Sequence, residues 1–583
     1  MSKIGRAWTS VAAVLIGASV AGAGGGPENV LILYNAHASA THPGALNDAP
    51  EIAEYYRALR GIPRKNMLPI FGLEEARTVP LPQTHTITLA QYKTRILVPL
   101  GDKLRSLKYP DEIDYLVLIR GLPYRVDLEG KVAAPNDCAS LTSMLGVYRT
   151  HRASNPLDEL WDDPHPISDS PPYRRPSTAN PLCYAGNYQE DYQNPTKSHL
   201  KYLTSTGIAR RTLAEGQVPS FRRHRTVPVA DAPNDWVFSG NLFVVSWLDG
   251  FSYGDAKNLA DLGVMGDGAL IDACGLSPCS GTSGAPSLLC MKGRNLERQA
   301  RDEECRFALE LLEGAGFCTE YVRDPLTGLP VHDTNLANRS LAALFTGSDK
   351  LQTHFSADGD ALSGNCFLPG AIFCNLTSNS GNPPNFFCNA DGSCPPFNEE
   401  TQKSGEVQTS IARVVRMGVT GAHATVAEPF SHTFPGAGTL LLYTFGYNFA
   451  ESFFFTQPNV HWQNTYLGDP LTTAYAVRPI VSYPGAAPRG SPLLVTASHA
   501  QGIARIRVYL DGVRRADVDN PDCTSPFTVA VSTTGLTLGP HDVVAVGYAC
   551  NTLVARPGWP ENVQFPRPDV QGWSSGSLNV VRP

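Results

Sequence analysis

Short apolar runs and amphipathic segments alternate along residues 29–478. Runs of about four to eight apolar residues bounded by turn formers are typical of buried parallel strands. They occur at residues 29–34, 67–71, 114–119, 242–246, 317–322, 341–345 and 371–374. Helical patterns lie at residues 50–59, 91–100, 255–262, 296–313, 407–417 and 449–455. This order predicts an α/β fold with a doubly wound, mostly parallel sheet.

Beyond Arg478-Pro479 the pattern changes to stretches in which apolar and polar residues alternate, with turn signals between them. The alternating stretches are Leu493–Ser498, Ile503–Leu510, Phe527–Val531 and Val543–Tyr548, and Asp511-Gly512 is the clearest turn between them. Alternation with turn formers at this spacing is typical of an all-β sandwich. The chain is therefore expected to hold an α/β domain over residues 24–478 and a β-sandwich over residues 479–583.

Residues 1–23 have the pattern of a secretory signal peptide. Lys3 and Arg6 precede an apolar stretch at residues 11–20, and small residues at 21–23 provide a cleavage site. A short membrane anchor is the alternative, although the stretch is shorter than the roughly 20 residues that a span needs. No later segment is apolar enough to span, so a secreted, periplasmic or cell-surface protein without a transmembrane segment after cleavage is expected.

Three stretches interrupt the α/β pattern. Residues 150–235 are rich in Pro, Tyr and Asn, whereas residues 274–295 and 382–404 are rich in Cys. We interpret all three as insertions. The chain has 13 cysteines, a number that fits an oxidising compartment, and their spacing lacks the paired CxxC pattern of zinc sites. Structural disulfides are expected, and one of them is expected to join Cys523 to Cys550.

The formal charge of −7 gives no electrostatic reason to expect nucleic acid as a partner. No cofactor motif is present, so no cofactor is expected. A Ca²⁺ ion held by loop carboxylates stays open, although the chain contains no EF-hand loop.

Several motifs together resemble an uncharacterised family of exported bacterial proteins from species that carry the exosortase sorting system. The motifs are LILYNAH, EIAEYYRALRGIPRKN, DYLVLIRGLPYRV, VVSWLDGFS, LFTGSDK, FLPGAIFCNLTSNSG, GVTGAHATVAEP and HWQNTYLGDPL. More distantly, the layout is similar to gingipain-type cysteine peptidases of the caspase-like fold. The segment LTLGPHDVVAVGYAC resembles a bacterial immunoglobulin-like module. Because no apolar span follows Val581, the chain is not expected to be an exosortase substrate itself.

The gingipain resemblance implies a His after one strand and a nucleophilic Cys after the next, within hydrogen-bond reach of each other. Here the first turn reads Gly347-Ser348-Asp349, so Ser348 stands at the His position. Ser378 best matches the nucleophile position, and Cys374 lies slightly earlier. The expected pair is therefore absent as written.

Two hypotheses follow for Cys374. It is either a nucleophile with His354 as its base, or a structural residue that is buried in a strand or joined to Cys366 or Cys388. Ser378 has a similar pair of roles: a nucleophile activated by His423 or His432, or, with Ser380, a helix cap or a ligand-binding hydroxyl. No GxSxG elbow surrounds Ser378.

Further polar residues follow predicted strands and are candidates for ligand binding. They are Ser348, Asp349, Asp249, Arg120, Glu428 and Asp469, with Arg125 nearby. The structural alternative is that the carboxylates cap turns and bind backbone N–H groups. The leading hypothesis is a non-catalytic exported protein that binds an envelope polysaccharide or a partner protein. The rival hypothesis is a hydrolase that uses Cys374 or Ser378.

Overall fold

The computed structural model describes residues 25–36, 48–73, 86–128, 138–146, 227–228, 237–238, 243–291, 296–322, 339–346, 365–376, 378, 380–381, 410–427, 433–454, 456–457, 463–550, 553–555, 564–566 and 570–583.

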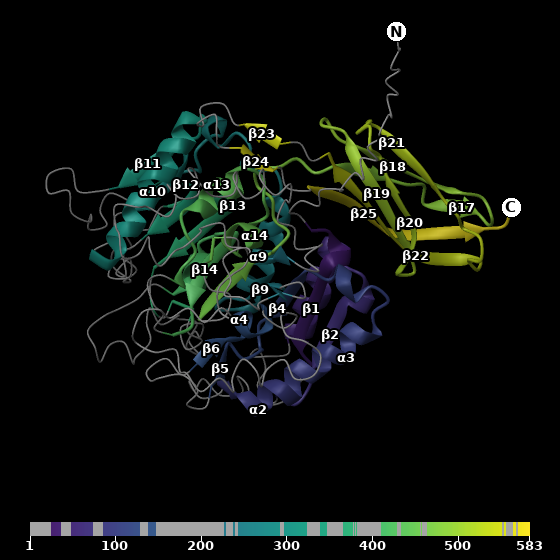
Figure 1. The fold of residues 1–583 in the computed structure, drawn as a ribbon, viewed down its shortest axis with the longest axis horizontal. Helices are drawn as coiled ribbons and strands as arrows, with labels where there is room; N and C mark the ends of the chain where they lie inside the picture. Colours follow the sequence, from purple (N-terminus) through teal and green to yellow (C-terminus); the bar gives the residue numbers. More distant parts are fainter. Residues whose placement is uncertain are drawn as a thin grey trace, which may run out of the picture.

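A ten-stranded sheet forms the centre of the α/β part (Figure 1). Its strands, in spatial order, are β11 (Thr319–Val322), β10 (Ser283–Met291), β12 (Arg339–Thr346), β13 (Cys366–Asn375), β14 (Gly421–Thr425), β15 (Asn464–Gly468), β9 (Val244–Leu248), β4 (Tyr115–Ile119), β1 (Val30–Asn35) and β2 (Met67–Ile70). Strands β14 and β15 pair antiparallel, whereas β10 to β14 and β9 to β2 pair in parallel with their neighbours. The prediction of an α/β protein with a mostly parallel sheet is confirmed.

Helices follow most of these strands, as the sequence pattern predicts. They are α1 (Asp48–Arg60), α2 (Leu89–Gln91), η4 (Tyr92–Leu97), α3 (Val98–Ser106), α4 (Leu141–Gly146), α9 (Tyr253–Met265), α10 (Leu296–Gly314), α12 (Ile411–Arg416), α13 (Gly438–Thr444) and α14 (Phe449–Phe454). The single helix predicted over residues 91–100 is instead a succession of segments, of which η4 is a π-helix. Within the described part of the chain, no helix combines the length and apolar character that crossing a membrane requires.

Strand β10 differs from the sequence prediction, which places residues 274–295 in an insertion. Residues 283–291 instead enter the large sheet between β11 and β12. The strand begins with small residues, Ser283-Gly-Ala-Pro-Ser287, and only its last part is apolar. The pairing shifts register at Ser287, where the regular apolar part begins. The local pattern of apolar residues is therefore too short to predict this strand.

Four disulfides link described cysteines. They are Cys274–Cys318, Cys279–Cys366, Cys290–Cys305 and Cys523–Cys550. The first three join strands and helices around β10 to β13, and the fourth confirms the predicted bond near the end of the chain. Because Cys366 is bonded to Cys279, the hypothesis that it bonds to Cys374 is wrong, and Cys374 remains a thiol.

Two further sheets, which we call the C-terminal sheets, follow residue 479. One contains β16 (Ile480–Ser482), β18 (Leu493–Ser498) and β21 (Phe527–Val531). The other contains β17 (Ala486–Pro488), β25 (Gln571–Val581), β22 (Gly539–Ala549), β19 (Ile503–Leu510) and β20 (Val513–Asp519). Inward-facing residues of both sheets, among them Val495 and Ile506, form one buried core. All four alternating stretches predicted as strands are strands.

A buried charge cluster joins the α/β part to the C-terminal sheets. The side chain of Arg60, at the end of α1, pairs with Asp469 after β15 and with Asp267, 2.6 Å away. Arg478 pairs with Asp267 at 3.0 Å. Both guanidinium groups lie over the indole ring of Trp573 on β25, and the indole N–H donates to the Arg60 carbonyl at 2.9 Å. We call these five residues the Arg60 cluster.

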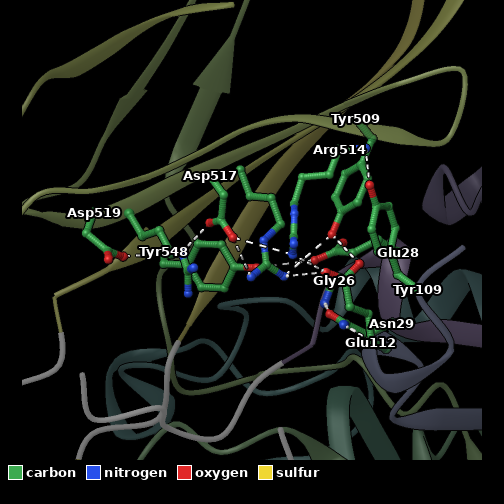
Figure 2. Close-up of polar contacts among 12 residues, drawn as sticks. Gly26, Glu28, Asn29, Tyr109, Glu112, Tyr509, Arg514, Asp517, Asp519 and Tyr548 are labelled. Atoms are coloured by element: carbon green, nitrogen blue, oxygen red, sulfur yellow. Dashed lines mark hydrogen bonds and ion pairs between the residues drawn. The ribbon is translucent and has the colours of Figure 1, made fainter. Parts of the chain in front are cut away.

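A second set of contacts at the same junction centres on Glu112 (Figure 2). Its carboxylate accepts from Tyr509 at 2.6 Å and from Arg514 at 2.7 Å. Burial raises the pKa of Tyr509, so the phenol stays protonated and donates. Lys65 also donates to the Gly512 carbonyl at 2.7 Å. Figure 1 shows the result: the β1–β2 edge of the large sheet lies beside β19, β20 and β22.

Replacing the most buried carboxylate of the Arg60 cluster should destabilise the protein. The side chains of Asp469 and Arg60 are 0% and 3% exposed. Asp469→Ala removes one of the two carboxylates that pair with the buried Arg60 guanidinium. We therefore expect a loss of about 3 kcal/mol in the free energy of unfolding, measured by urea denaturation. The control is Asp102→Ala, which removes an exposed pair with Arg105 and should leave the midpoint unchanged. A loss below about 1 kcal/mol for Asp469→Ala would contradict the stabilising role of Asp469 in the Arg60 cluster.

Acid should weaken the same cluster through Asp267. Burial acts to raise the pKa of this carboxyl, but Arg478 and Arg60 outweigh burial and lower the pKa from 3.8 to about 2. A depressed pKa in the folded state stabilises the protein above the unfolded value, and this contribution is lost as the pH falls from about 4 through about 2. The difference in unfolding free energy between wild type and Asp267→Asn should therefore shrink by about 2 kcal/mol over that range. A difference that stays constant with pH would exclude this role.

Candidate functional site

Three neighbouring strands bring a thiol, an imidazole and an amide onto one face of the large sheet. Cys374 on β13 lies opposite His423 on β14 in the parallel register. His423 in turn lies opposite Tyr466 on the antiparallel strand β15, and Asn464 is two residues before Tyr466. Because side chains alternate along a strand, Asn464 and Tyr466 point to the face that carries His423. Strand register alone therefore assembles the group, which we call the Cys374 site.

The hydrogen bonds of the Cys374 site define the tautomer of His423. The amide nitrogen of Asn464 donates to the Thr433 carbonyl at 2.9 Å, so the amide oxygen is the acceptor that faces His423. The Nε2–H of His423 donates to this oxygen at 2.9 Å. Nδ1 is then the unprotonated nitrogen, and it lies 3.6 Å from the Sγ of Cys374. The thiol can therefore donate to a neutral imidazole that the amide holds in place.

All three side chains of the Cys374 site are buried. Cys374 is 1% exposed, and His423 and Asn464 are 0% exposed. The His423 ring packs against Phe434, Phe453 and Tyr466, with ring centroids 5.5, 6.2 and 5.4 Å away. This aromatic cover separates the thiol from solvent. The order Cys–His–Asn is that of a cysteine nucleophile with its base and orienting amide, but the thiol lies in the core.

Ser378 lies beside the Cys374 site without joining it. Its side chain is buried, and its carbonyl accepts from the Thr425 hydroxyl at 2.7 Å, which ties the segment after β13 to the end of β14. Within the described residues, no imidazole forms a hydrogen bond with the Ser378 hydroxyl. Ser380 is also buried, and its carbonyl accepts from the N–H of Ile411, the first residue of α12. Both serines thus lie in a segment that fixes the ends of neighbouring elements.

A second polar cluster forms after β4 and β9, where two of the candidate ligand-binding residues, Arg120 and Asp249, meet. The two side chains are ion-paired at 3.4 Å, and both are buried. Asp249 also accepts from Tyr124 and from the N–H of Gly250. Arg125 is not part of this cluster, because it donates to the Thr86 hydroxyl and to the Val426 carbonyl.

A chain of contacts leads from Tyr124, beside Asp249, to strand β15. The Tyr124 ring stacks on Trp247 at 4.1 Å, and the Trp247 indole donates to Thr142 at 2.8 Å. The Thr142 hydroxyl lies 3.0 Å from that of Thr465, the neighbour of Asn464 on β15. Thr465 alternates with Asn464 and Tyr466 along β15, so it faces away from the Cys374 site, and this chain of contacts reaches the strand but not the site. No group of three His, Cys, Asp or Glu side chains within the described ranges is placed to hold a metal ion.

The remaining candidates lie elsewhere. Asp469 belongs to the Arg60 cluster, where it also accepts from Tyr56 at 2.7 Å and from the N–H of Leu471 at 3.0 Å. It is therefore separate from the Cys374 site. Other candidates lie outside the described residues, namely Ser348, Asp349, His354, Glu428 and His432, as does Cys388, the other suggested disulfide partner of Cys374.

The sequence analysis did not identify Asn464. It considered His423 as a base for Ser378, whereas in the structure His423 lies beside Cys374. Asn464 follows the HWQ motif as an ordinary polar residue at the start of a strand. The available signal was a His inside the otherwise small and apolar stretch Gly421–Val426, since a polar ring in a buried strand needs a partner. The identity of that partner depends on strand register, which the local sequence does not contain.

The fold and the site define a mixed α/β protein with a large, mostly parallel sheet, a buried Cys–His–Asn group and two C-terminal sheets. No family model and no curated protein matches the chain. Among solved structures, one described as "Structure of Protease" is similar at 13% identity and a TM-score of 0.29, covering 66% of this chain and 88% of that one. A structure of fibronectin(III)-like modules of Clostridium thermocellum CbhA matches at 17% identity and a TM-score of 0.13, covering 21% and 55%. Likenesses this distant carry no argument about activity.

Removing the orienting amide should destabilise the core. Asn464→Ala removes two buried hydrogen bonds, one from the His423 Nε2–H to the amide oxygen and one from the amide nitrogen to the Thr433 carbonyl. Each such loss costs about 1–3 kcal/mol, so we expect a decrease of about 2–4 kcal/mol in the free energy of unfolding, measured by urea denaturation. Asn579→Ala is the matched control, because the Asn579 side chain is exposed on β25. Equal midpoints for the two variants would show that the Asn464 hydrogen bonds contribute nothing to stability.

Proposed function

We propose that this chain is an exported, non-catalytic protein that binds an envelope polysaccharide or a partner protein. In this proposal a caspase- or gingipain-like α/β domain over residues 24–478 precedes an immunoglobulin-like sandwich over residues 479–583. The four disulfides among described residues support residence outside the cytoplasm, in the periplasm, at the cell surface or in the medium.

The burial of the Cys374 site carries the proposal. A nucleophile must approach a substrate carbonyl to within van der Waals distance, and its base must be close to the leaving group. Cys374 and His423 lie beneath Phe434, Phe453 and Tyr466, so neither meets a substrate in this conformation. Their hydrogen bonds instead satisfy polar groups inside the sheet, which a core requires.

A cysteine hydrolase is the second candidate, and one observation favours it. The separation of 3.6 Å between Cys374 Sγ and His423 Nδ1, with Asn464 on the far side of the ring, has the hydrogen-bond order of a catalytic triad. In such an enzyme, Nδ1 takes the thiol proton and the sulfur adds to the carbonyl carbon. The protonated imidazole then returns the proton to the leaving group. Ser378 is the alternative nucleophile of this candidate.

Thiol accessibility tests the proposal against this rival. We expect iodoacetamide to leave Cys374 unmodified in the native protein and to alkylate it after unfolding in guanidinium, with mass spectrometry reading each site. Cys138, a partly exposed cysteine that also lies outside the described disulfides, is the internal control and should react in the native state. Rapid native labelling of Cys374, together with hydrolysis of casein or a fluorogenic ester that Cys374→Ala abolishes, would establish the hydrolase and refute the binding proposal.

A further inference from the structure

A cavity of about 530 Å³ lies at the junction between the α/β part and the C-terminal sheets. It is lined by Glu28, by the end of α1 and the turn that follows it, by residues before β4, and by β19, β22, β25 and the β19–β20 turn. Its size is within the usual range of small-molecule sites, which commonly occur where two structural units meet. Several segments distant in sequence thus line one cavity that is open to solvent on one side.

Basic side chains form one wall of this cavity. They are Arg57, Arg64 and Lys65. Glu54 forms ion pairs with both arginines, at 2.7 Å to Arg57 and 3.1 Å to Arg64. Lys65 differs from them: its ammonium donates to the Gly512 carbonyl, and no described carboxylate lies within ion-pair distance of it.

The surroundings of Lys65 leave its charge incompletely compensated. Burial lowers the pKa of Lys65, Glu112 acts in the opposite direction, and Lys108 and Lys103 lower the pKa further. Glu112 is already engaged by Tyr509 and Arg514, so it compensates Lys65 only in part. An anion that reached Lys65 from the cavity would form a charge-assisted hydrogen bond in partly desolvated surroundings, where such bonds are strongest.

Hydrogen-bond acceptors also line the cavity. Asp511 and Asp542 line the cavity from the turn after β19 and from β22. Asp511 already accepts from His541 at 2.6 Å and from the N–H of Asp542 at 3.0 Å, which fixes its carboxylate in place. Carboxylates of this kind accept from sugar hydroxyls, whereas they repel a second anion. The cavity therefore presents the Lys65 ammonium and carboxylate acceptors close together, since Lys65 contacts Gly512, the neighbour of Asp511.

We propose that this cavity binds an acidic saccharide, with one carboxylate or phosphate group seated at Lys65 and neutral hydroxyls donating to Asp511 and Asp542. The inference rests on the binding function proposed above and narrows the ligand to a sugar that carries a single anionic group at one end. The volume suits one or two sugar rings, so a longer polymer would enter by its terminus.

Calorimetric titration of the full chain with its disulfides intact tests this inference. The probes are a glucuronosyl-galactose disaccharide with one carboxylate, glucose 6-phosphate for a sugar phosphate, inorganic phosphate alone, and uncharged galactobiose. At least one of the two acidic sugars should bind saturably and about tenfold more tightly than galactobiose and phosphate, because a charge-assisted hydrogen bond contributes that factor. The better probe identifies the anionic group. Binding should weaken as salt rises.

Variants locate the site. Lys65→Gln should weaken binding of the acidic sugar about tenfold, whereas Lys65→Arg should retain it, because the charge is preserved. The matched control is Lys103→Gln, a partly buried lysine on α3 that does not line the cavity, and it should bind as wild type does. Thermal unfolding of each variant confirms that it is folded before titration.

Three results would overturn the inference. They are the absence of saturable binding of both acidic sugars up to about 10 mM, equal affinity for galactobiose, and equal losses in Lys65→Gln and Lys103→Gln. None of these results affects the thiol-labelling outcome, so failure of the saccharide assignment and failure of the binding proposal are distinguishable.

Discussion

The structure depends on the pairing of two buried guanidinium groups, Arg60 and Arg478, with two carboxylates and one indole ring. A buried cation is tolerated only where opposite charge and hydrogen bonds compensate its loss of water. Asp267, Asp469 and Trp573 supply this compensation, and they come from the segment after α9, from the end of β15 and from β25. Because Trp573 lies on β25, contact between the large sheet and the C-terminal sheets at this point completes the cluster.

Much of the fold was predictable because its signals are local. Apolar runs bounded by turn formers identified strands such as Tyr115–Ile119, and the alternation of Ile503–Leu510 identified a strand with one buried face. Strand β10 and helix α13 (Gly438–Thr444) were missed for the same physical reason. Each begins with small residues, so its periodic part is too short to stand out, and burial among neighbours determines its conformation.

The candidate site was predictable only in part. Arg120 and Asp249 each follow a strand directly, and the two strands are neighbours, so their meeting follows from the order of elements. The Cys374 site depends on register across three strands, two of which are antiparallel. A shift of one residue in β14 would turn His423 to the opposite face of the sheet. No pattern within Gly421–Thr425 specifies that register.

The contacts at the junction also constrain the order in which the chain can acquire its native structure. Trp573 donates to the Arg60 carbonyl across 513 residues of sequence, and Tyr548 donates to Glu28 across 520. A chain that emerges from its amino end therefore exposes the β1–α1 edge until almost the last strand has been made. Pairings this distant slow folding and leave apolar surface open to association. Synthesis of almost the whole chain therefore precedes the last native contacts of this edge.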